Sequence, residues 1–277
     1  MPELPEVETM RRGILAAVGS QVTAVEKLRC SRLPIEIKPA IATFRRRVVG
    51  KTIREIGRAG KRVVIWLDSG DAIILEPRMA GLVLVGEAPS KEHLRWRLDL
   101  TGGPIESIFY WDRRGLGNVR LLSKEEAEQQ LGPNKLGPDG LVVTGDDYHR
   151  HLGHSQREVK VALLDQRAVA GIGNIYAAEI LHLSKIHPRR KCCDISKRAW
   201  NTIADNTHKV LNAAIYYEGS TLVNGTYRSA SNKKGGYQNK HLVYGREGKP
   251  CTRCKQGIIE RIVQAQRSTF FCGKCQK

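Results

Sequence analysis

Four cysteines near the C-terminus have the spacing of a metal site. Two residues separate Cys251 from Cys254, two separate Cys272 from Cys275, and residues 255–271 lie between the pairs. Each Cys-x-x-Cys turn presents two thiolates to one tetrahedral metal, and the segment between the turns returns as a hairpin. The pattern predicts one structural Zn²⁺ with no open position for a substrate. Four free thiols or a redox pair is the alternative.

The segment between the two cysteine pairs predicts a β-hairpin whose tip carries a cation. GIIERIVQ and STFF form its strand-like arms, and the bend falls at residues 265–267. Arg267 therefore lies near the tip, where a guanidinium is suited to hold a phosphate. Cys30, Cys192 and Cys193 have no partner at ligand spacing and are expected to be ordinary buried or surface thiols.

The first residues, MPELPEVETM, place Pro2 close to the carboxylates of Glu3 and Glu6. Removal of Met1, which a small second residue commonly permits, exposes Pro2 as a secondary amine. Its free base can attack a sugar C1′ and form an iminium, as an activated lysine does. Glu3 and Glu6 are then close enough to move protons for that reaction. The residues alone also fit a frayed acidic tail, so both interpretations stay open.

A Gly-x-Gly turn precedes a second candidate binding element. Gly171 and Gly173 join two helical runs and permit tight turning. Asn174 is expected to cap the following helix, whose free N–H groups suit a phosphate. A plain helical-hairpin turn explains the same letters equally well.

The elements that must position these residues change character along the chain. A helix is expected over about residues 5–18, because Pro5 and apolar residues recur at helical spacing. Short β-rich runs fill residues 20–122, with a helix expected over 39–49, and predict an antiparallel sandwich or barrel. Helical patterns fill residues 146–218, and a Gly-, Ser-, Asn- and Lys-rich loop follows at 219–244.

The sequence thus predicts an α+β multidomain fold. The expected parts are an N-terminal antiparallel β-sandwich with flanking helices, a linker, a helical domain that carries the loop, and a zinc finger, at residues 1–137, 138–145, 146–244 and 245–277.

Charge and composition narrow the partners. The 277 residues carry a net charge of +18, and 41% are hydrophobic, as in ordinary globular proteins. No apolar run approaches the roughly 20 residues of a membrane helix, and the acidic start lacks the apolar region of a secretory signal. A cytoplasmic protein that binds a polyanion, most commonly nucleic acid, is expected. A generally basic or ribosome-associated protein is the alternative.

Three separated motifs resemble the formamidopyrimidine-DNA glycosylase family, over essentially the full length. They are PELPEVET, LLDQRAVAGIGNIYAAEILHLSKIHP and the cysteine pairs with QRSTFFCGKCQ. The resemblance implies a helix-two-turns-helix in the helical domain, a four-cysteine β-hairpin zinc finger, and double-stranded DNA bound between the domains. It also implies a nucleoid-associated monomer that acts in base excision repair as a bifunctional glycosylase and AP lyase. The implied substrates are 8-oxoguanine and formamidopyrimidines opposite cytosine.

The resemblance also assigns roles near the reacting sugar. Pro2 corresponds to the nucleophile, Glu3 to the proton donor that opens the sugar, and Glu6 to the residue beside the flipped base. Lys61 resembles the lysine that supports catalysis and holds a phosphate; without the family it is an ordinary strand-edge lysine.

Further roles concern the DNA around the lesion. Met79, Arg114 and Leu116 match the side chains that fill the vacated space in the duplex. Asn174 and Arg267 resemble the pair that clamps phosphates. Without the resemblance, Met79 is expected to be a buried methionine and Leu116 a leucine of the hydrophobic core. Weaker matches are Lys160 and the start of the lesion-cover loop at residues 219–222.

The chain departs from the family pattern at several contact positions. Glu76 replaces a phosphate-contacting histidine, with Arg78 next to it as a compensating cation. Arg113 and Leu116 replace a proline and a phenylalanine, and Gln238 replaces a phenylalanine. These changes leave lesion and opposite-base preference open. They also motivate two rival functions, a noncatalytic damaged-DNA-binding protein and an oxidised-pyrimidine glycosylase of the same superfamily.

Overall fold

The computed structural model describes residues 2–222 and 227–277, which fall into two compact units. One unit comprises Met1–Gly132 and Ile215–Gln238, and the other comprises Pro133–Ala214 and Asn239–Lys277. The domain boundaries expected from the sequence remain a prediction. Met1 and residues 223–226 of the predicted lesion loop lie outside the described residues. Within the described ranges, no helix is both long and apolar enough to cross a membrane.

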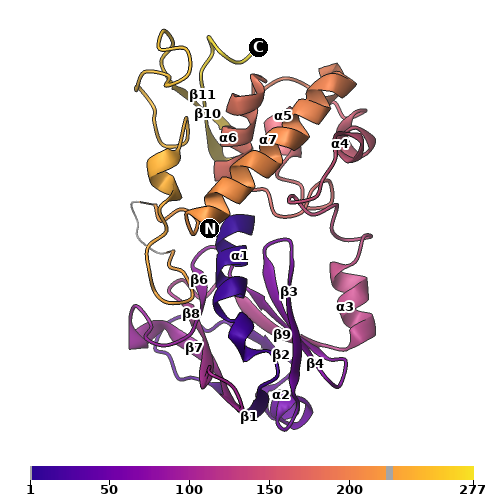
Figure 1. Ribbon diagram of the computed structural model, residues 1–277, viewed down its shortest axis with the longest axis vertical. Coiled ribbons are helices and arrows are strands. Elements are labelled where there is room, and N and C mark those ends of the chain that lie inside the picture. Colours follow the sequence, from indigo (N-terminus) through magenta and orange to yellow (C-terminus); the bar gives the residue numbers. More distant parts are fainter. Residues whose placement is uncertain (1, 223–226) are drawn as a thin grey trace. The chain divides into compact units, whose positions relative to one another are not determined.

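Two β-sheets form the first unit (Figure 1). Their strand orders are β1-β7-β8-β6 and β2-β9-β5-β4-β3, and every pairing is antiparallel except that of β2 with β9. Val25 and Leu98 of one sheet share a buried core with Ile65 and Ile73 of the other, which confirms the predicted sandwich. The strands are β1 Gln21–Lys27, β2 Glu36–Lys38, β3 Ile53–Ala59, β4 Arg62–Leu67, β5 Ala72–Glu76, β6 Gly81–Leu84, β7 Leu94–Thr101, β8 Ser107–Asp112 and β9 Asn118–Leu122.

The edge strand β1 shows how a local irregularity keeps the core filled. Its register with β7 shifts between Val22 and Ala24. An extra residue in one strand reverses which side chains point inward beyond it. Val22 and Val25 are therefore both buried, and Phe44 and Val48 of helix α2 (Ile41–Val48) join the same core.

Helix α1, Leu4–Gly13, packs against this unit's strands β3, β4 and β6. Leu4, Val7 and Met10 recur at helical spacing and are fully buried. The helix predicted over residues 5–18 is shorter in the structure, since a 3₁₀ turn replaces its last part at Leu15–Ala17. The packed face of α1 fixes the position of the residues that precede it.

The second unit is helical and ends in a hairpin. Ala178 of α6 packs with Val243, Ile259 and Cys272, so the C-terminal hairpin rests on that helix. The elements are α4 Gly145–Leu152, α5 Val159–Ala162, α6 Asn174–Ser184, η3 Cys192–Asp194, α7 Lys197–Tyr216, η4 Tyr237–Lys240, β10 Glu260–Gln264 and β11 Arg267–Phe271. The last two residues of α7 and the first two of η4 group with the first unit.

Three local expectations differ from the structure. The run at residues 157–169, expected to be helical, contains only the short α5, and turns follow it. Helix α3, Lys124–Leu131, was not expected, although Ser123 and Glu126 form a capping box that the sequence displays. Strands β2 and β3 were not among the apolar runs identified from the sequence, since β2 has only three residues and β3 carries the charged Arg54, Glu55 and Arg58.

A buried carboxylate fastens α1 to the sandwich. Both oxygens of Glu8 accept hydrogen bonds from Arg11, at 2.8 and 2.9 Å, and one accepts another from Arg12 at 2.8 Å. Arg58 of β3 donates to Glu8 at 3.1 Å, and Arg11 donates to the Ile56 carbonyl oxygen at 3.1 Å. The cluster therefore joins the helix to a neighbouring strand.

Burial alone would raise the pKa of Glu8, but hydrogen bonds from Arg11 and Arg12 outweigh it and lower the pKa to about 2. A carboxyl group whose pKa falls on folding stabilises the folded state above its unfolded pKa. That contribution is lost as the pH falls toward the folded pKa.

We expect Glu8→Gln to reduce the free energy of unfolding at pH 7 by about 3 kcal/mol, because three arginines lose their shared acceptor. The deficit should shrink as the pH falls from about 4.5 to about 2, where wild-type Glu8 also becomes neutral. Urea unfolding across this pH range measures the effect. The exposed Glu87→Gln variant serves as control and should match wild type; a Glu8→Gln deficit that does not change with pH contradicts the assignment.

Candidate active site and nucleic-acid contacts

The predicted catalytic residues at the N-terminus are buried at the start of α1. Pro2 is buried, and Glu3 and Glu6 are each 2% exposed. The Glu3 N–H donates to one oxygen of Glu6 at 2.9 Å, and the Ser220 N–H donates to the other at 2.8 Å. The segment is thus held in place rather than frayed, and one carboxylate joins it to the loop after α7.

That loop is built to approach Glu6 closely. Gly219 has a φ of +79°, and a Cβ atom there would lie 2.9 Å from a Glu6 oxygen. At the base of the loop, Gln238 accepts from the Thr221 N–H at 3.0 Å and donates to the Gly235 carbonyl oxygen at 2.7 Å. Gln238, which departs from the family pattern, therefore ties the two ends of this loop together.

Lys61 lies in the two-residue turn between β3 and β4, rather than at the edge of a regular strand. Gly60 beside it has a φ of +57°, which the tight turn requires. Arg58 donates to the Gly60 carbonyl oxygen at 3.0 Å and also binds Glu8 of α1. The turn that carries Lys61 is therefore fastened to the helix that follows Pro2.

The three predicted wedge residues are exposed on turns at one end of the sandwich. Met79 is 42% exposed and Leu116 is 37% exposed, so neither is the buried residue of the alternative interpretation. Arg114 is also exposed. The β5–β6 turn carries Met79 and the β8–β9 turn carries the other two, and the pairing of Gly81 with Asp112 brings these turns to the same end.

A buried tyrosine and two glycines lock these turns together. The Tyr110 hydroxyl donates to the Glu76 carbonyl oxygen at 2.7 Å. A Cβ atom at Gly81 or Gly117 would lie 2.5 or 1.8 Å from that hydroxyl oxygen. Only glycine fits at either position, and the contact fixes the spacing of the two turns.

Asp112 shapes the turn that presents Arg114 and Leu116. Its carboxylate accepts the Arg114 N–H at 2.9 Å and the Gly117 N–H at 2.8 Å. Asp112 is fully buried, so these two bonds supply the acceptor partners that a buried carboxylate needs. The exposed side chains thus stand on a rigid turn.

The unexpected Glu76 is surrounded by cations. Arg62 donates to it at 3.3 Å, the Arg78 Nε lies 3.7 Å away and Arg120 lies 3.9 Å away, while Asn118 donates at 3.1 Å. Burial would raise the pKa of Glu76, but Arg62 and the other partners lower it, so the group is a carboxylate. Its charge is neutralised locally, which reduces repulsion of a nearby phosphate.

In the second unit, the predicted phosphate-binding residues lie close together. The fully buried Lys160 donates to the Asn174 side-chain oxygen, and the Asn174 side-chain nitrogen donates to the Ser268 carbonyl oxygen at 2.9 Å. Arg267 precedes Ser268 and is exposed after the two-residue turn at Ala265–Gln266.

The expected N-cap was wrong by one residue. Gly173 caps α6, and Asn174 is its first helical residue. The Asn174 side chain is engaged by Lys160 and Ser268, so it is not available to cap the helix. The Gln166 side chain supports the preceding turn, where it accepts the Gly171 N–H at 2.9 Å and donates to the Ile172 carbonyl oxygen at 3.0 Å.

The four cysteines have the geometry of a tetrahedral metal site. Their sulfur atoms all lie within 4.8 Å of one another, with Cys251 to Cys275 at 3.7 Å and Cys254 to Cys272 at 3.9 Å. A tetrahedron with Zn–S bonds of about 2.3 Å has sulfur atoms about 3.8 Å apart. Disulfides require about 2.05 Å, so the residues fit Zn²⁺ and exclude the redox pair in this state. The remaining three cysteines are free thiols, as expected.

Several residues that build the site were not found from the sequence. They include Tyr110, Asp112, Gln166 and Glu179, the last of which accepts the N–H groups of residues 242–244 at 2.8–3.0 Å. Burial raises the pKa of Glu179, and the three N–H bonds act against that change. Asp112 and Gln166 each precede a glycine-containing turn, which is the signal that could have identified them.

Three family models match the chain. The formamidopyrimidine-DNA glycosylase N-terminal domain matches residues 1–119, the H2TH domain of that glycosylase matches residues 136–225, and the zinc finger found in FPG and IleRS matches residues 248–277. Two curated relatives are named formamidopyrimidine-DNA glycosylase. The protein from Streptococcus mutans is 36% identical over 282 residues and covers 100% of both chains. The protein from Chloroflexus aggregans is 38% identical over 282 residues and covers 100% of this chain and 98% of its own.

Solved structures show the same fold. A Lactococcus lactis Fpg mutant in complex with DNA that contains Fapy-dG has a TM-score of 0.86 and 31% identity, with 100% of both chains covered. The MutM (Fpg) protein from Thermus thermophilus has a TM-score of 0.84 and 32% identity, covering 99% of this chain and 98% of its own. The models span most of the chain, and the relatives exceed 30% identity over its full length. The chain therefore belongs to the formamidopyrimidine-DNA glycosylase family.

Proposed function

We propose that this protein is a bifunctional DNA glycosylase and AP lyase that removes oxidised purines from duplex DNA in base excision repair. The curated relatives carry the glycosylase name, and a structural neighbour is a complex with Fapy-dG DNA. We further propose that it acts as a monomer on the nucleoid, with 8-oxoguanine and formamidopyrimidines opposite cytosine as substrates.

One observation carries the proposal. Pro2 and Glu3 are buried immediately before a helix whose own face is locked into the sandwich, and Glu6 is fixed by two backbone N–H groups. A nucleophile must be held within a fraction of an ångström of its attack geometry, and a frayed tail cannot provide that. The order around Pro2 is what an N-terminal nucleophile requires.

The reaction follows from these groups. The Pro2 nitrogen forms a bond to C1′ and the damaged base leaves with its bonding electrons and a proton. Glu3 protonates the ring oxygen O4′, which opens the sugar and gives an iminium. Loss of a C2′ proton then breaks the C3′–O bond, and a second elimination breaks the C5′–O bond. Water hydrolyses the iminium and restores the amine.

The remaining predicted residues hold the DNA. Lys61, Asn174 and Arg267 supply phosphate contacts, with the α6 N-terminus beside Asn174. The fully buried Lys160 supports these contacts by holding the Asn174 side chain. Exposed Met79, Arg114 and Leu116 take the space of the extruded nucleotide. Their exposure and fixed turns support this role.

Two rival functions make different predictions. A noncatalytic damaged-DNA-binding protein binds abasic DNA and releases no base, so any measurable excision removes it. An oxidised-pyrimidine glycosylase releases thymine glycol faster than paired 8-oxoguanine. The neutralised Glu76 weakens the case for lost activity, since its charge is balanced by Arg62 and its neighbours.

Borohydride reduction during the reaction should trap a covalent complex between the protein and DNA that contains 8-oxoguanine. Tryptic mass spectrometry should place the DNA remnant on the peptide that begins at Pro2. Glu3→Gln should slow base excision at least about 100-fold, because a positioned proton donor is lost, while affinity for the lesion duplex persists.

The matched control is Lys61→Gln, which removes the rival amine. It should still give the adduct at Pro2, although more slowly because a phosphate contact is gone. Absence of any adduct in an active preparation, or an adduct on Lys61, contradicts the proposed nucleophile. Protein that retains Met1 and still cuts lesion DNA contradicts it as well.

Leu116→Ala or Met79→Ala should lower kcat/KM for lesions in a paired duplex by about tenfold, because less apolar surface fills the vacated space. Cleavage at an unpaired, bulged lesion should change much less, since extrusion there costs little. Leu15→Ala, which truncates a leucine of similar exposure (39%) away from these turns, is the control. Equal losses on paired and bulged substrates would show that the two residues do not act as a wedge.

Removal of Zn²⁺ should abolish specific DNA binding, because the hairpin that presents Arg267 depends on the metal for its folding. Elemental analysis should find one Zn²⁺ per chain in wild type and a loss of metal and of DNA affinity in Cys254→Ser. Cys30→Ser and Cys193→Ser should retain both. Full DNA affinity in metal-free protein contradicts the structural role of the site.

A further inference from the structure

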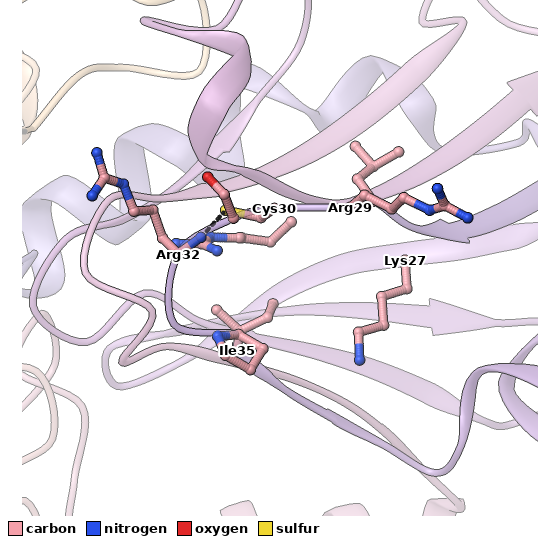
Figure 2. Close-up of a pocket in the computed structure, with 9 residues that line it drawn as sticks. Lys27, Arg29, Cys30, Arg32 and Ile35 are labelled. Atoms are coloured by element: carbon pink, nitrogen blue, oxygen red, sulfur yellow. Dashed lines mark hydrogen bonds between the residues drawn. The ribbon is translucent and has the colours of Figure 1, made fainter.

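A cavity of about 610 Å³ opens in the first unit beside the start of β7. Figure 2 shows Cys30 between Arg29 and Arg32, with Lys27 and Ile35 on the other side. The cavity is lined by Lys27, Leu28, Arg29, Cys30, Ser31, Arg32, Pro34, Ile35 and Arg95. Among these residues four are cationic and none is acidic, and none belongs to the predicted active site.

A buried arginine forms part of the wall. Arg95 is 2% exposed, and its Nε donates to the Asp112 carbonyl oxygen at 2.9 Å. Its two terminal nitrogens have no hydrogen-bond partner among the described residues. A guanidinium stays charged in proteins, and buried donors without acceptors are unfavourable. The terminal nitrogens of Arg95 therefore need an acceptor that the described residues do not supply.

Nearby carboxylates do not satisfy Arg95. Glu92 binds Arg32 at 2.7 Å, and the Asp112 carboxylate accepts the N–H groups of Arg114 and Gly117. The cavity thus keeps an excess of positive charge, and Lys27 on its rim is exposed. Oxyanions satisfy such a site, because a guanidinium fork donates two parallel hydrogen bonds to phosphate or carboxylate.

We propose that this cavity binds a phosphate-class oxyanion, with the terminal nitrogens of Arg95 as donors and Lys27 as the second cation. The phosphate belongs either to a free phosphate ester or to a DNA strand. The apolar Leu28, Pro34 and Ile35 leave room for the organic group attached to it.

The cavity is connected to the turn that carries Arg114 and Leu116. Arg95 binds the carbonyl oxygen of Asp112, where that turn begins. A Cβ atom at Gly115 would lie 2.2 Å from the Leu33 carbonyl oxygen, so the segment that forms the wall touches the turn directly. An anion on Arg95 therefore acts on the conformation of the turn. This consequence for DNA rests on the proposed function, whereas the anion site does not.

Calorimetric titration of the full chain with inorganic phosphate, at constant ionic strength in chloride, tests the site. Saturable binding is expected. Arg95→Gln should weaken it by at least about tenfold, because charge-assisted hydrogen bonds are lost, and Lys27→Gln by about threefold. In NMR spectra, the Arg95 Nε–H signal should shift together with the backbone N–H signals of Arg114 and Gly117.

Arg46→Gln removes a basic surface residue of the same unit, outside the cavity, and should leave phosphate binding unchanged. If Arg95→Gln does not fold, as judged by thermal unfolding, the exposed Lys27→Gln and the NMR shifts decide. No binding at phosphate concentrations on the order of 10 mM, or binding that folded Arg95→Gln retains, overturns the proposal.

A second measurement identifies the source of the phosphate. If a phosphate of undamaged duplex DNA occupies the cavity, the negative slope of log K against log salt should become less steep by about one in Arg95→Gln. An unchanged slope, with phosphate binding lost in the same variant, assigns the cavity to a free phosphate ester. Either result supports the site, and neither depends on base excision, so failure here is distinct from failure of the proposed enzyme.

Discussion

The hydrogen bonds of the Glu8 carboxylate are the interaction on which the position of the proposed catalytic residues depends. A reactive group at a chain terminus has no covalent connection on one side, so its position is set entirely by the residues on its C-terminal side. In this chain those residues form α1, and Glu8 joins that helix to β3 through Arg58, while Arg11 reaches the Ile56 carbonyl oxygen. The Arg58 side chain also supports the turn of Lys61. One cluster therefore positions both the proposed nucleophile, Pro2, and the turn that carries Lys61.

The opposite requirement governs the turns that carry the proposed wedge residues. Apolar side chains that must enter DNA have to be exposed, and exposure removes the packing that would normally order them. The chain places the order underneath them instead, in the Tyr110 hydroxyl between Gly81 and Gly117 and in the Asp112 carboxylate.

Local patterns predicted much of this structure. Alternating apolar residues identified most strands of the sandwich, the cysteine spacing identified a site with metal geometry, and helical spacing identified α1, α6 and α7. The failures involve partners distant in sequence. The sequence predicted Asn174 as a helix N-cap, because its side-chain hydrogen bonds with Lys160 and Ser268 cannot be inferred from the adjacent residues. The run at 157–169 has helical composition, yet turns replace the helix after α5, where the Gln166 carbonyl oxygen accepts the distant Gly137 N–H and the adjoining Ala170 N–H donates to the Pro138 carbonyl oxygen. Tyr110 and Glu179 gave no local signal at all.

Buried carboxylates in a protein of charge +18 that binds a polyanion present a physical difficulty, because each one repels phosphate. The structure resolves it by binding these groups to fixed donors. Glu6 and Asp112 each accept two backbone N–H groups and Glu179 accepts three, whereas Glu8 and Glu76 are surrounded by arginines. These five carboxylates therefore hold turns and helices in place while their own charge is compensated, and the excess positive charge of the chain stays available at the surface for DNA. Arg95 differs from these carboxylates, since both of its terminal nitrogens lack a partner among the described residues, and it also lines a cavity rich in cations.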